Sequence, residues 1–468
     1  MSYIQGQSRT QRSLFPEAID ELIEEHSAVR VIDAFVSSLD LQALQFGRAV
    51  PAQTGRPGYD PADMLKLYVY GYLNQIRTTR RLEREAQRNV ELLWLLNRLR
   101  PDFKTIADFR KNNARAIVGC CRAFSLFCRE QGLFAGQLVA IDGSKFQAVA
   151  SRKQVWSKER LQKVSQAIDR KIKDYLGQLD SADAKEPAHA VEDTQAALAA
   201  LAEQKAKLQQ IAQQLEDSEG STLVASEPQA KTMRLPQAKL APAYNVQTAV
   251  DDKHALIACF EVTTEAGDRE QLSAMAENAK AALDAQHLTV LADAGYDNAE
   301  QCAKCEAAGI EPVVPAQARV NPEGEQYFHK DQFQYEAEHD RFRCPAGESL
   351  YPQRTDHARQ RVLYSTRACG GCALRSSCTS ASRRWVQRLI HAEAGQRANQ
   401  RAKSNPALMR KRSALVEHPF AGLKRIIPRF VLRGVHKVSA EIALAVTAYN
   451  LKRAMNILGA HKLREAWA

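Results

Sequence analysis

The sequence predicts a mixed α/β protein whose central sheet carries acidic residues at the ends of apolar strands. Leu138–Ile141 and Leu288–Leu291 are apolar segments of strand length, and an aspartate follows each within two residues. Segments on either side repeat apolar residues at helical spacing. Two further stretches break this pattern, one rich in Ala, Gln, Lys, Glu and Leu and the other containing four cysteines. We therefore expect a central α/β domain, a helical N-terminal domain and two insertions.

Length and charge narrow the function. The chain has 468 residues, enough for two to four domains, and its 45% apolar content predicts a packed core. Lys and Arg (65) outnumber Asp and Glu (54), which gives a net charge of +11. The excess is concentrated at Arg77–Arg115 and Arg397–Arg433. Localised positive charge favours a polyanionic partner, nucleic acid before membrane, although a single basic cluster is more often a solvated surface.

No targeting or membrane segment is evident. The first residues, MSYIQGQSRTQRSLFPE, lack the apolar region of a signal peptide. No run approaches the ~18 uninterrupted apolar residues of a membrane span. We therefore expect a cytoplasmic protein whose ten cysteines are free thiols or metal ligands rather than disulfides.

Residues 1–132 are expected to form the helical N-terminal domain. Asp60 followed by Pro61 is typical of a helix start, with the carboxylate as cap and the proline in the first turn. This helix should run to about Asn74. A capping-box-like TIAD segment predicts a further helix over Thr105–Gln131.

A stripe of arginines follows the first of these helices. Three of them stand at i, i+4 and i+8: Arg80, Arg84 and Arg88. This spacing puts them on one helical face, with Leu82 and Ala86 turned away. A helix, a short turn and an arginine-striped helix favour a helix-turn-helix-like DNA reader with these arginines as contacts. The alternative is an ordinary surface helix whose arginines pair with neighbouring glutamates, and the sequence does not choose between the two.

Residues 156–218 are predicted to be an inserted helical hairpin. Leu198, Leu201 and Leu208 recur at helical spacing, and a loop containing Pro187 separates this run from the preceding helical run. The pattern indicates a short antiparallel coiled coil. It would serve dimerisation or DNA clamping, or it would be a spacer inserted in a loop.

Residues 321–394 are predicted to be a small four-cysteine module. Its cysteines are Cys344, Cys369, Cys372 and Cys378. Four soft ligands, including one C-x2-C pair, suit tetrahedral Zn²⁺, and adjacent Gly and Pro allow tight turns around a metal. The gap between the first two is wider than in a standard zinc ribbon, so four unliganded thiols remain the alternative. The other six cysteines of the chain are expected to be non-ligands.

Three acids far apart in the sequence are the candidate catalytic residues: Asp142, Asp293 and Glu417. The two aspartates follow apolar strands and have a glycine nearby, whereas Glu417 lies in a basic, helix-patterned stretch. Cleavage of a phosphodiester needs an activated oxygen and positive charge at the attacking and leaving oxygens. Two Mg²⁺ (or Mn²⁺) ions about 4 Å apart supply both when carboxylates hold them. Each acid alone would pass for a structural cap, but jointly they favour a shared metal site.

The basic stretch around Glu417 is predicted to be a helix that starts at Asn405–Pro406. In a continuous helix Arg410, Glu417 and Lys424 are seven residues apart and share one face. A metal-binding acid with a cation two turns to each side suits a DNA phosphate. Pro419 should kink or restart the helix, which leaves the alignment of Lys424 open.

The order of motifs along the chain resembles that of a known family. GRPGYDPADMLKLYVYGYL, TTRRLEREAQRN and PDFKTIADFRK are similar to its N-terminal domain, and AIDGSKF, LADAGYD and VEHPFAGLK match its three catalytic motifs. Lys424, with six residues after Glu417, matches its signature lysine. The CP-x-G and C-x2-C-x5-C segments resemble the cysteine-rich insertion of some members. The chain thus resembles a bacterial insertion-sequence DDE transposase with an InsH-type N-terminal domain.

The resemblance implies an RNase H-like catalytic domain, with Asp142 on the central first strand, Asp293 after the fourth and Glu417 on a following helix. Three segments would build it: residues 133–155, 239–320 and 395–468. It implies Mg²⁺-dependent cleavage at the terminal inverted repeats of the element, followed by transfer of the freed 3′-OH into target DNA. The implied partners are double-stranded DNA, at the element ends and the target, and a second copy of the chain in the DNA complex. Such a protein would be nucleoid-associated.

The C-terminal motif departs from the family in one respect. Arg410 and Ser413 occupy the positions of the family's tyrosine and arginine, and Arg412 is one residue out of register. We still predict Arg410, Arg412 and Lys424 as DNA contacts, but the handling of the terminal phosphate is open. Two alternative functions are a metal-dependent nuclease without strand transfer and a non-catalytic, transposase-derived DNA-binding protein. The presence of all three acids argues against the second.

Overall fold

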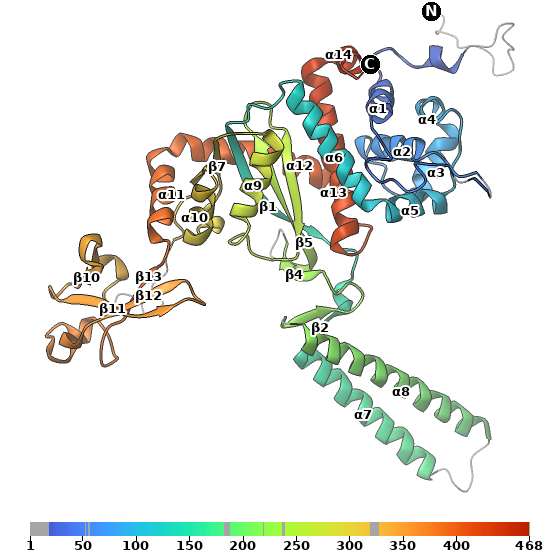
Figure 1. The fold of residues 1–468 in the computed structure, drawn as a ribbon. Helices are drawn as coiled ribbons and strands as arrows, with labels where there is room; N and C mark the ends of the chain where they lie inside the picture. Colours follow the sequence, from blue (N-terminus) through green and yellow to red (C-terminus); the bar gives the residue numbers. More distant parts are fainter. Residues whose placement is uncertain are drawn as a thin grey trace, which may run out of the picture.

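The protein is described by a computed structural model that covers residues 18–51, 53–54, 57–181, 188–218, 220–235, 239–318 and 327–467. A central sheet covered by helices lies between the N-terminal helices on one side and a smaller β module on the other, and a helical hairpin projects away from it (Figure 1). The first 17 residues, the loop with Pro187 and residues 321–326 of the predicted cysteine module lie outside the described residues.

The central sheet has six strands in the order β4-β5-β1-β7-β8, with β6 also paired to β5. Their bounds are β1 Leu138–Gln147, β4 Lys231–Arg234, β5 Leu240–Asp251, β6 Ile257–Thr263, β7 Leu288–Leu291 and β8 Ile310–Val313. Strand β1 pairs antiparallel with β5 on one side and parallel with β7 on the other, and β7 pairs parallel with β8. The carboxyl ends of β1 and β7 therefore reach the same edge of the sheet.

Strand β1 is longer than the sequence predicted. We expected it to end at Asp142, but its pairing with β5 continues through Gln147. The shorter pairing with β7 ends at Ala140, opposite Leu291. Beyond Ile141, β1 is therefore paired only with β5, and most of the residues in that part of the strand are polar.

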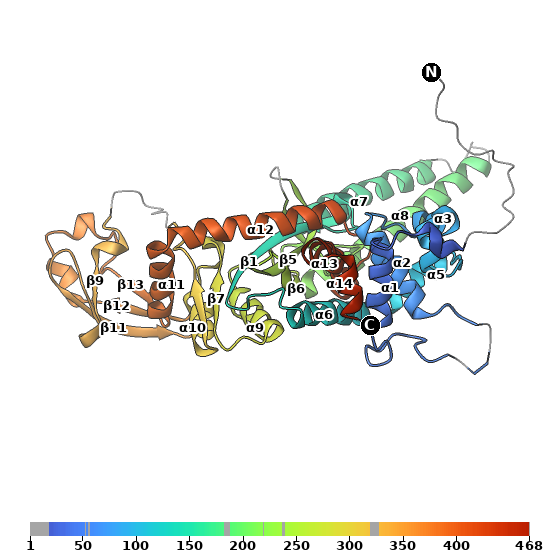
Figure 2. The same cartoon turned by 90° about the horizontal axis from the view of Figure 1, so that it is seen from above.

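Helices cover both faces of the sheet. Leu415 and Val416 of α12 pack with Ala140 of β1 and Leu291 of β7 on one face. Figure 2 shows α12 along that face, with α6, α9 and α10 on the other. The bounds are α9 Leu272–Leu283, α10 Ala299–Ala307, α11 Ala392–Ser404 and α12 Pro406–Ile426.

Pro419 does not end α12, so the restart that we expected as one of two outcomes does not occur. The helix runs unbroken over 21 residues with Pro419 inside it. A proline removes one backbone hydrogen bond. Pro419, Phe420 and Leu423 are all buried, so tertiary packing holds this stretch of α12 in the helix. Glu417 and Lys424 therefore belong to one helix.

The N-terminal region is helical. Its helices are α1 Ala28–Ser37, α2 Pro61–Leu73, α3 Thr79–Arg88, α4 Val90–Leu95, α5 Phe103–Asn112 and α6 Ala114–Glu130. At the start of α2, Asp60 accepts a hydrogen bond from the Ala62 backbone N–H at 2.7 Å, as the sequence predicted. The single helix expected over Thr105–Gln131 is wrong, because Asn113 separates α5 from α6.

The long C-terminal helix α13 (Val435–Leu458) joins the N-terminal helices to the sheet. It packs against α2, α6, α12 and β6, and 14 of its residues are buried. Its core residues belong to the same apolar cluster as those of α1, α2, α6 and the sheet. The short α14 (Ala460–Glu465) ends the described chain beside α1. The N-terminal helices and the central sheet thus share one core.

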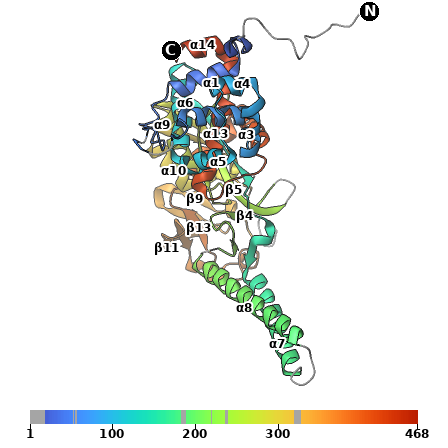
Figure 3. The same ribbon diagram turned by 90° about the vertical axis from the view of Figure 1, so that its right-hand side faces the viewer.

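The inserted hairpin consists of α7 (Lys158–Ser181) and α8 (Ala188–Asp217). A small two-stranded sheet at its base pairs β2 (Val155–Ser157) with β3 (Thr222–Val224). Leucines from both helices, including Leu161, Leu201 and Leu208, form a core separate from that of the sheet. Figure 3 shows the pair of helices extending away from the rest of the protein.

The cysteine module is built on a five-stranded antiparallel sheet in the order β13-β12-β11-β10-β9. Its strands are β9 Gln334–Glu336, β10 Arg341–Arg343, β11 Ser349–Asp356, β12 Arg361–Ser365 and β13 Val386–Leu389. A small core that includes Phe333, Phe342 and Tyr364 supports it. All ten cysteines of the chain are unpaired. Within the described ranges, none of the helices combines the length and apolarity that crossing a bilayer requires.

Candidate active site

Asp142 lies on the face of the sheet that α12 covers. Side chains alternate along a strand, so Asp142 points to the same side as Ala140, which packs against α12. Its side chain is 22% exposed, and Oδ1 accepts a hydrogen bond from the Gly143 backbone N–H at 2.9 Å. Burial raises the pKa of Asp142, and the guanidinium of Arg412 opposes this rise.

Asp293 follows β7 by two residues at the equivalent position of the neighbouring strand. It caps the 3₁₀ helix Ala294–Tyr296, where its Oδ1 accepts a hydrogen bond from the Gly295 backbone N–H at 2.8 Å. Ala140 and Leu291 are partners in the parallel pairing, so the two aspartates stand two residues beyond matched positions. With 46% of its side chain exposed, Asp293 opens the site to solvent.

Arg412 bridges the two aspartates. Its Nη2 lies 2.9 Å from Asp142 Oδ1 and 3.4 Å from Asp293 Oδ2. The side chain is only 12% exposed, and its buried Nε has no partner among the described residues. The sequence predicted Arg412 as a DNA contact; here its charge is engaged by the acids. One cation therefore already lies between the carboxylates.

Glu417 is on the same helix as Arg412, but it is not grouped with the two aspartates as a metal ligand among the described residues. It is exposed, and its carboxylate has no hydrogen-bond or ion-pair partner among the described residues. Five residues separate it from Arg412, which is about 140° around the helix axis. Glu417 thus lies on another flank of α12 than Arg412, the flank that it shares with Lys424 seven residues later. Arg410 is also exposed.

Lys424 approaches the site from the next turns of α12. Its Nζ lies 5.9 Å from the centre of the Phe146 ring on β1. Burial lowers the pKa of Lys424, and the negative charge of Asp142 opposes this effect. A second basic group therefore stands within electrostatic reach of the first aspartate.

Whether the site fits a metal depends on Glu417. Across the residues that the structure describes, no three His, Cys, Asp or Glu side chains are grouped as metal ligands. The Asp142–Asp293 pair does fit a hard cation, because both donors are carboxylates and one guanidinium nitrogen already contacts both. Glu417 would have to come closer to the two aspartates to join them.

Sequence reasoning missed a polar network under the two aspartates. Asp268, in the loop between β6 and α9, accepts hydrogen bonds from Lys145, Asn245 and Gln247. Besides burial, the charges of Asp293 and Asp268 raise the pKa of Asp142. A signal was present, because YNVQTAV sets polar Asn245 and Gln247 into a strand that is otherwise small and apolar. Both side chains are fully buried, and a buried amide needs a partner.

The arginine stripe of α3 is on the surface, with Leu82 and Ala86 buried beneath it. Arg84 is exposed and has no ion-pair partner in the described chain, whereas Arg88 pairs with Glu85 at 2.5 Å and Arg80 lies over the Phe103 ring at 5.3 Å. Both interpretations of the stripe therefore keep some support. Its role in DNA binding stays a prediction.

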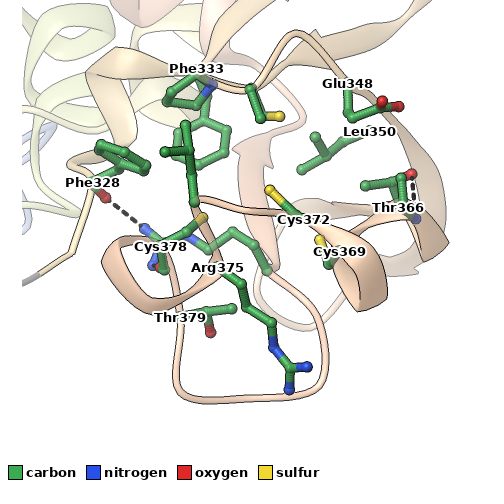
Figure 4. A pocket seen from close by; sticks show the side chains of 16 residues that line it. Phe328, Phe333, Glu348, Leu350, Thr366, Cys369, Cys372, Arg375, Cys378 and Thr379 are labelled. Carbon is green, nitrogen blue, oxygen red and sulfur yellow. Dashed lines mark hydrogen bonds between the residues drawn. The ribbon is translucent and has the colours of Figure 1, made fainter.

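The four cysteines of the β module line one small cavity. Figure 4 shows the side chains of Cys369, Cys372 and Cys378 around it, with Phe333 and Leu350 among the apolar neighbours. Cys344 also lines this space of about 20 Å³, which is room for one water-sized occupant. Burial raises the pKa of the Cys378 thiol, and the other three cysteines add to the rise. The donor type suits Zn²⁺, but no three of the thiols, all described, are close enough to be grouped as ligands.

Comparison with protein families gives two matches. Residues 17–112 match a family described as a transposase domain (DUF772), and residues 343–455 match one described as a transposase DDE domain. The second match contains Glu417 and all four cysteines of the module, whereas Asp142 and Asp293 lie outside both matched segments. No curated protein and no solved structure matches the chain.

Proposed function

Because the chain belongs to the insertion-sequence DDE transposases, we propose that it cuts DNA at the terminal inverted repeats of its element and joins the freed 3′-OH ends to target DNA. One observation supports this most strongly. Asp142 and Asp293, from neighbouring parallel strands, both contact the guanidinium of Arg412, which is on the helix that carries Glu417. Two-metal phosphoryl transfer on DNA uses paired carboxylates of this kind to hold its ions.

We assign the central sheet to the RNase H-like fold. Three features support the assignment. Asp142 is on the central strand β1, which is antiparallel to β5 and parallel to β7. In the series β1, β5, β6 and β7, Asp293 follows the fourth strand. Glu417 is on a later helix that packs across the same face of the sheet.

The proposed roles follow from charge and position. Asp142, Asp293 and Glu417 would hold Mg²⁺ or Mn²⁺, which supplies charge stabilisation at the attacking and leaving oxygens. Lys424, near Asp142, would contact the phosphate whose ester bond breaks, since a lysine offers a point charge to phosphate. Arg412 would exchange its carboxylate partners for DNA phosphate, and Arg410, exposed on the same helix, would contact the DNA nearby.

The rest of the chain would hold the DNA. Arg80, Arg84 and Arg88 on α3 would contact the element end, as in a helix-turn-helix reader. Two element ends have to be brought together, so a homodimer is expected in the DNA complex. A protein that acts on chromosomal DNA works at the nucleoid in the bacterial cytoplasm.

The test is a cleavage and joining assay. Full-length protein is incubated with a labelled duplex that ends in the element's terminal repeat, with a target plasmid, in Mg²⁺ or in EDTA. We expect nicks at the repeat terminus and end-to-plasmid products, both only with Mg²⁺. Cleavage without joining would favour the nuclease alternative. Sequence-specific binding with neither product would favour the non-catalytic one.

We further propose that Cys344, Cys369, Cys372 and Cys378 bind one structural Zn²⁺ after the thiols approach one another. The shared cavity and the soft donors support this. Purified protein should then contain about one Zn²⁺ per chain, and Cys372→Ala should lose it. Cys305→Ala, which alters the second cysteine of the other C-x2-C pair, buried in α10, is the matched control and should retain the metal. A folded, zinc-free preparation would contradict the proposal; metal content is measured by mass spectrometry.

A further inference from the structure

Asp268 is the centre of the polar network behind the two aspartates. Its carboxylate accepts two hydrogen bonds from the Lys145 ammonium, at 2.9 and 3.1 Å. It also accepts one from Asn245 Nδ2 and one from Gln247 Nε2, both at 2.7 Å. These three donors belong to β1 and β5, the two strands at the middle of the sheet. Asp268 therefore fixes side chains on both strands at once.

The network reaches the backbone on either side of the candidate site. Gly143, next to Asp142, is the register partner of Gln247, and Lys145 is the partner of Asn245. Gln247 Oε1 in turn accepts a hydrogen bond from the Tyr296 hydroxyl. Tyr296 is in the 3₁₀ helix that Asp293 caps. A chain of contacts thus runs from the strand of Asp142, through Asp268 and Gln247, to the turn of Asp293.

Packing around Asp268 is tight. A Cβ added to Gly143 would lie 2.4 Å from Asp268 Oδ1 and 2.2 Å from Gln247 Nε2, distances that real atoms do not adopt. Only glycine therefore fits beside Asp142 while the network is in place. The carboxylate of Asp268 is also occupied by its four donor contacts, which leaves it poorly placed to bind a metal itself.

We propose that Asp268 is a positioning residue that holds Asp142 and Asp293 at the mutual distance a divalent cation requires. The inference rests on the proposed function, because it assumes that the two aspartates bind metal. Groups that orient metal ligands from behind typically change metal affinity by about 10–100-fold when they are replaced. Asp268→Asn keeps the shape but replaces one acceptor oxygen by an NH2 group, which faces the Lys145 ammonium in either orientation, so the network has to rearrange.

The experiment compares Mn²⁺ binding by full-length wild type and Asp268→Asn, measured by calorimetry, together with thermal unfolding. We expect Mn²⁺ affinity to fall by about 10–100-fold in the variant. The matched control is Asp251→Asn at the far end of β5. Asp251 is also buried and accepts backbone hydrogen bonds from Ala135, Gly136 and Lys253. The Asp251→Asn variant should therefore unfold at a lower temperature than wild type while its Mn²⁺ affinity is unchanged.

A second variant covers the case in which Asp268→Asn does not fold. Tyr296→Phe removes only the hydroxyl that links Gln247 to the turn of Asp293, and it should weaken Mn²⁺ binding by a smaller factor in the same direction. Wild-type affinity in Asp268→Asn and Tyr296→Phe, or an equal loss in Asp251→Asn, would overturn the positioning role. If wild type itself neither binds Mn²⁺ nor cuts DNA, the proposed function fails, and this inference falls with it.

Discussion

Replacing Asp142 by asparagine should abolish DNA cleavage while leaving DNA binding nearly intact. Asparagine keeps the size of the side chain but removes the charge that holds the metal. A metal supplies several kcal/mol of transition-state stabilisation, so we expect a loss of about 1,000-fold or more in the cleavage rate. Affinity for DNA should hardly change because phosphate contacts dominate it. Single-turnover cleavage and a binding titration at the same salt concentration measure the two effects.

Asp252→Asn is a closely matched control. Asp252 has a side chain 19% exposed, against 22% for Asp142, and it pairs with Lys411 of α12 at 2.6 Å, one residue before Arg412. It lies outside the proposed site, so the variant should cut at the wild-type rate. Residual cutting by Asp142→Asn, or an equal loss in Asp252→Asn, would show that Asp142 does not act in catalysis.

Glu441→Gln should destabilise the junction between the N-terminal helices and α12. Glu441 of α13 is fully buried and accepts hydrogen bonds from the backbone N–H groups of Val431 and Leu432. Arg77 Nη1 lies 3.9 Å from its carboxylate. Burial raises the pKa of Glu441, and the nearby guanidinium of Arg110 opposes the rise.

Glu441→Gln should lower the free energy of unfolding of this junction by about 3–5 kcal/mol. The reason is that removing one member of a buried charged set leaves the others unpaired. Hydrogen exchange at Val431, Leu432 and α13 measures it as a lower free energy of opening. Glu203→Gln removes an exposed partner of Lys207 in the hairpin and should leave these amides as they are. Unchanged protection in Glu441→Gln would refute the role of the buried charge. Arg77 and Arg110 precede the sheet whereas Val431 follows α12, so this cluster connects the two regions that match transposase families.

The convergence of Asp142 and Asp293 could be predicted from the sequence. Both aspartates follow apolar segments of strand length, and parallel strands bring their carboxyl ends to one edge of a sheet. The capped start of α2 and the helical hairpin followed from local signals in the same way, since a carboxylate before a proline and leucines at helical spacing act over a few residues. Each of these features is determined by residues close together in the sequence, or by the same strand-then-aspartate pattern occurring twice.

Other features depended on contacts that no local pattern contains. The network of Asp268 joins a loop to two strands through side chains far apart in the sequence, so polar residues in an apolar strand were its only sign. Helical spacing related Glu417 to Arg410 and Lys424, but which face of α12 is buried was decided by Leu415, Val416 and Pro419 packing on the sheet. Packing of this kind also kept α12 continuous through Pro419.

The position of Glu417 is therefore the most direct test of the two-metal account. The measurement is a crystal structure of the full-length protein bound to duplex element-end DNA and Mn²⁺, with the ions located by anomalous scattering. The account predicts Mn²⁺ bound by Asp142, Asp293 and Glu417 together, with the Arg412 guanidinium moved from the aspartates to a DNA phosphate. Ions bound without Glu417, or Arg412 still bridging the aspartates with DNA in place, would contradict it.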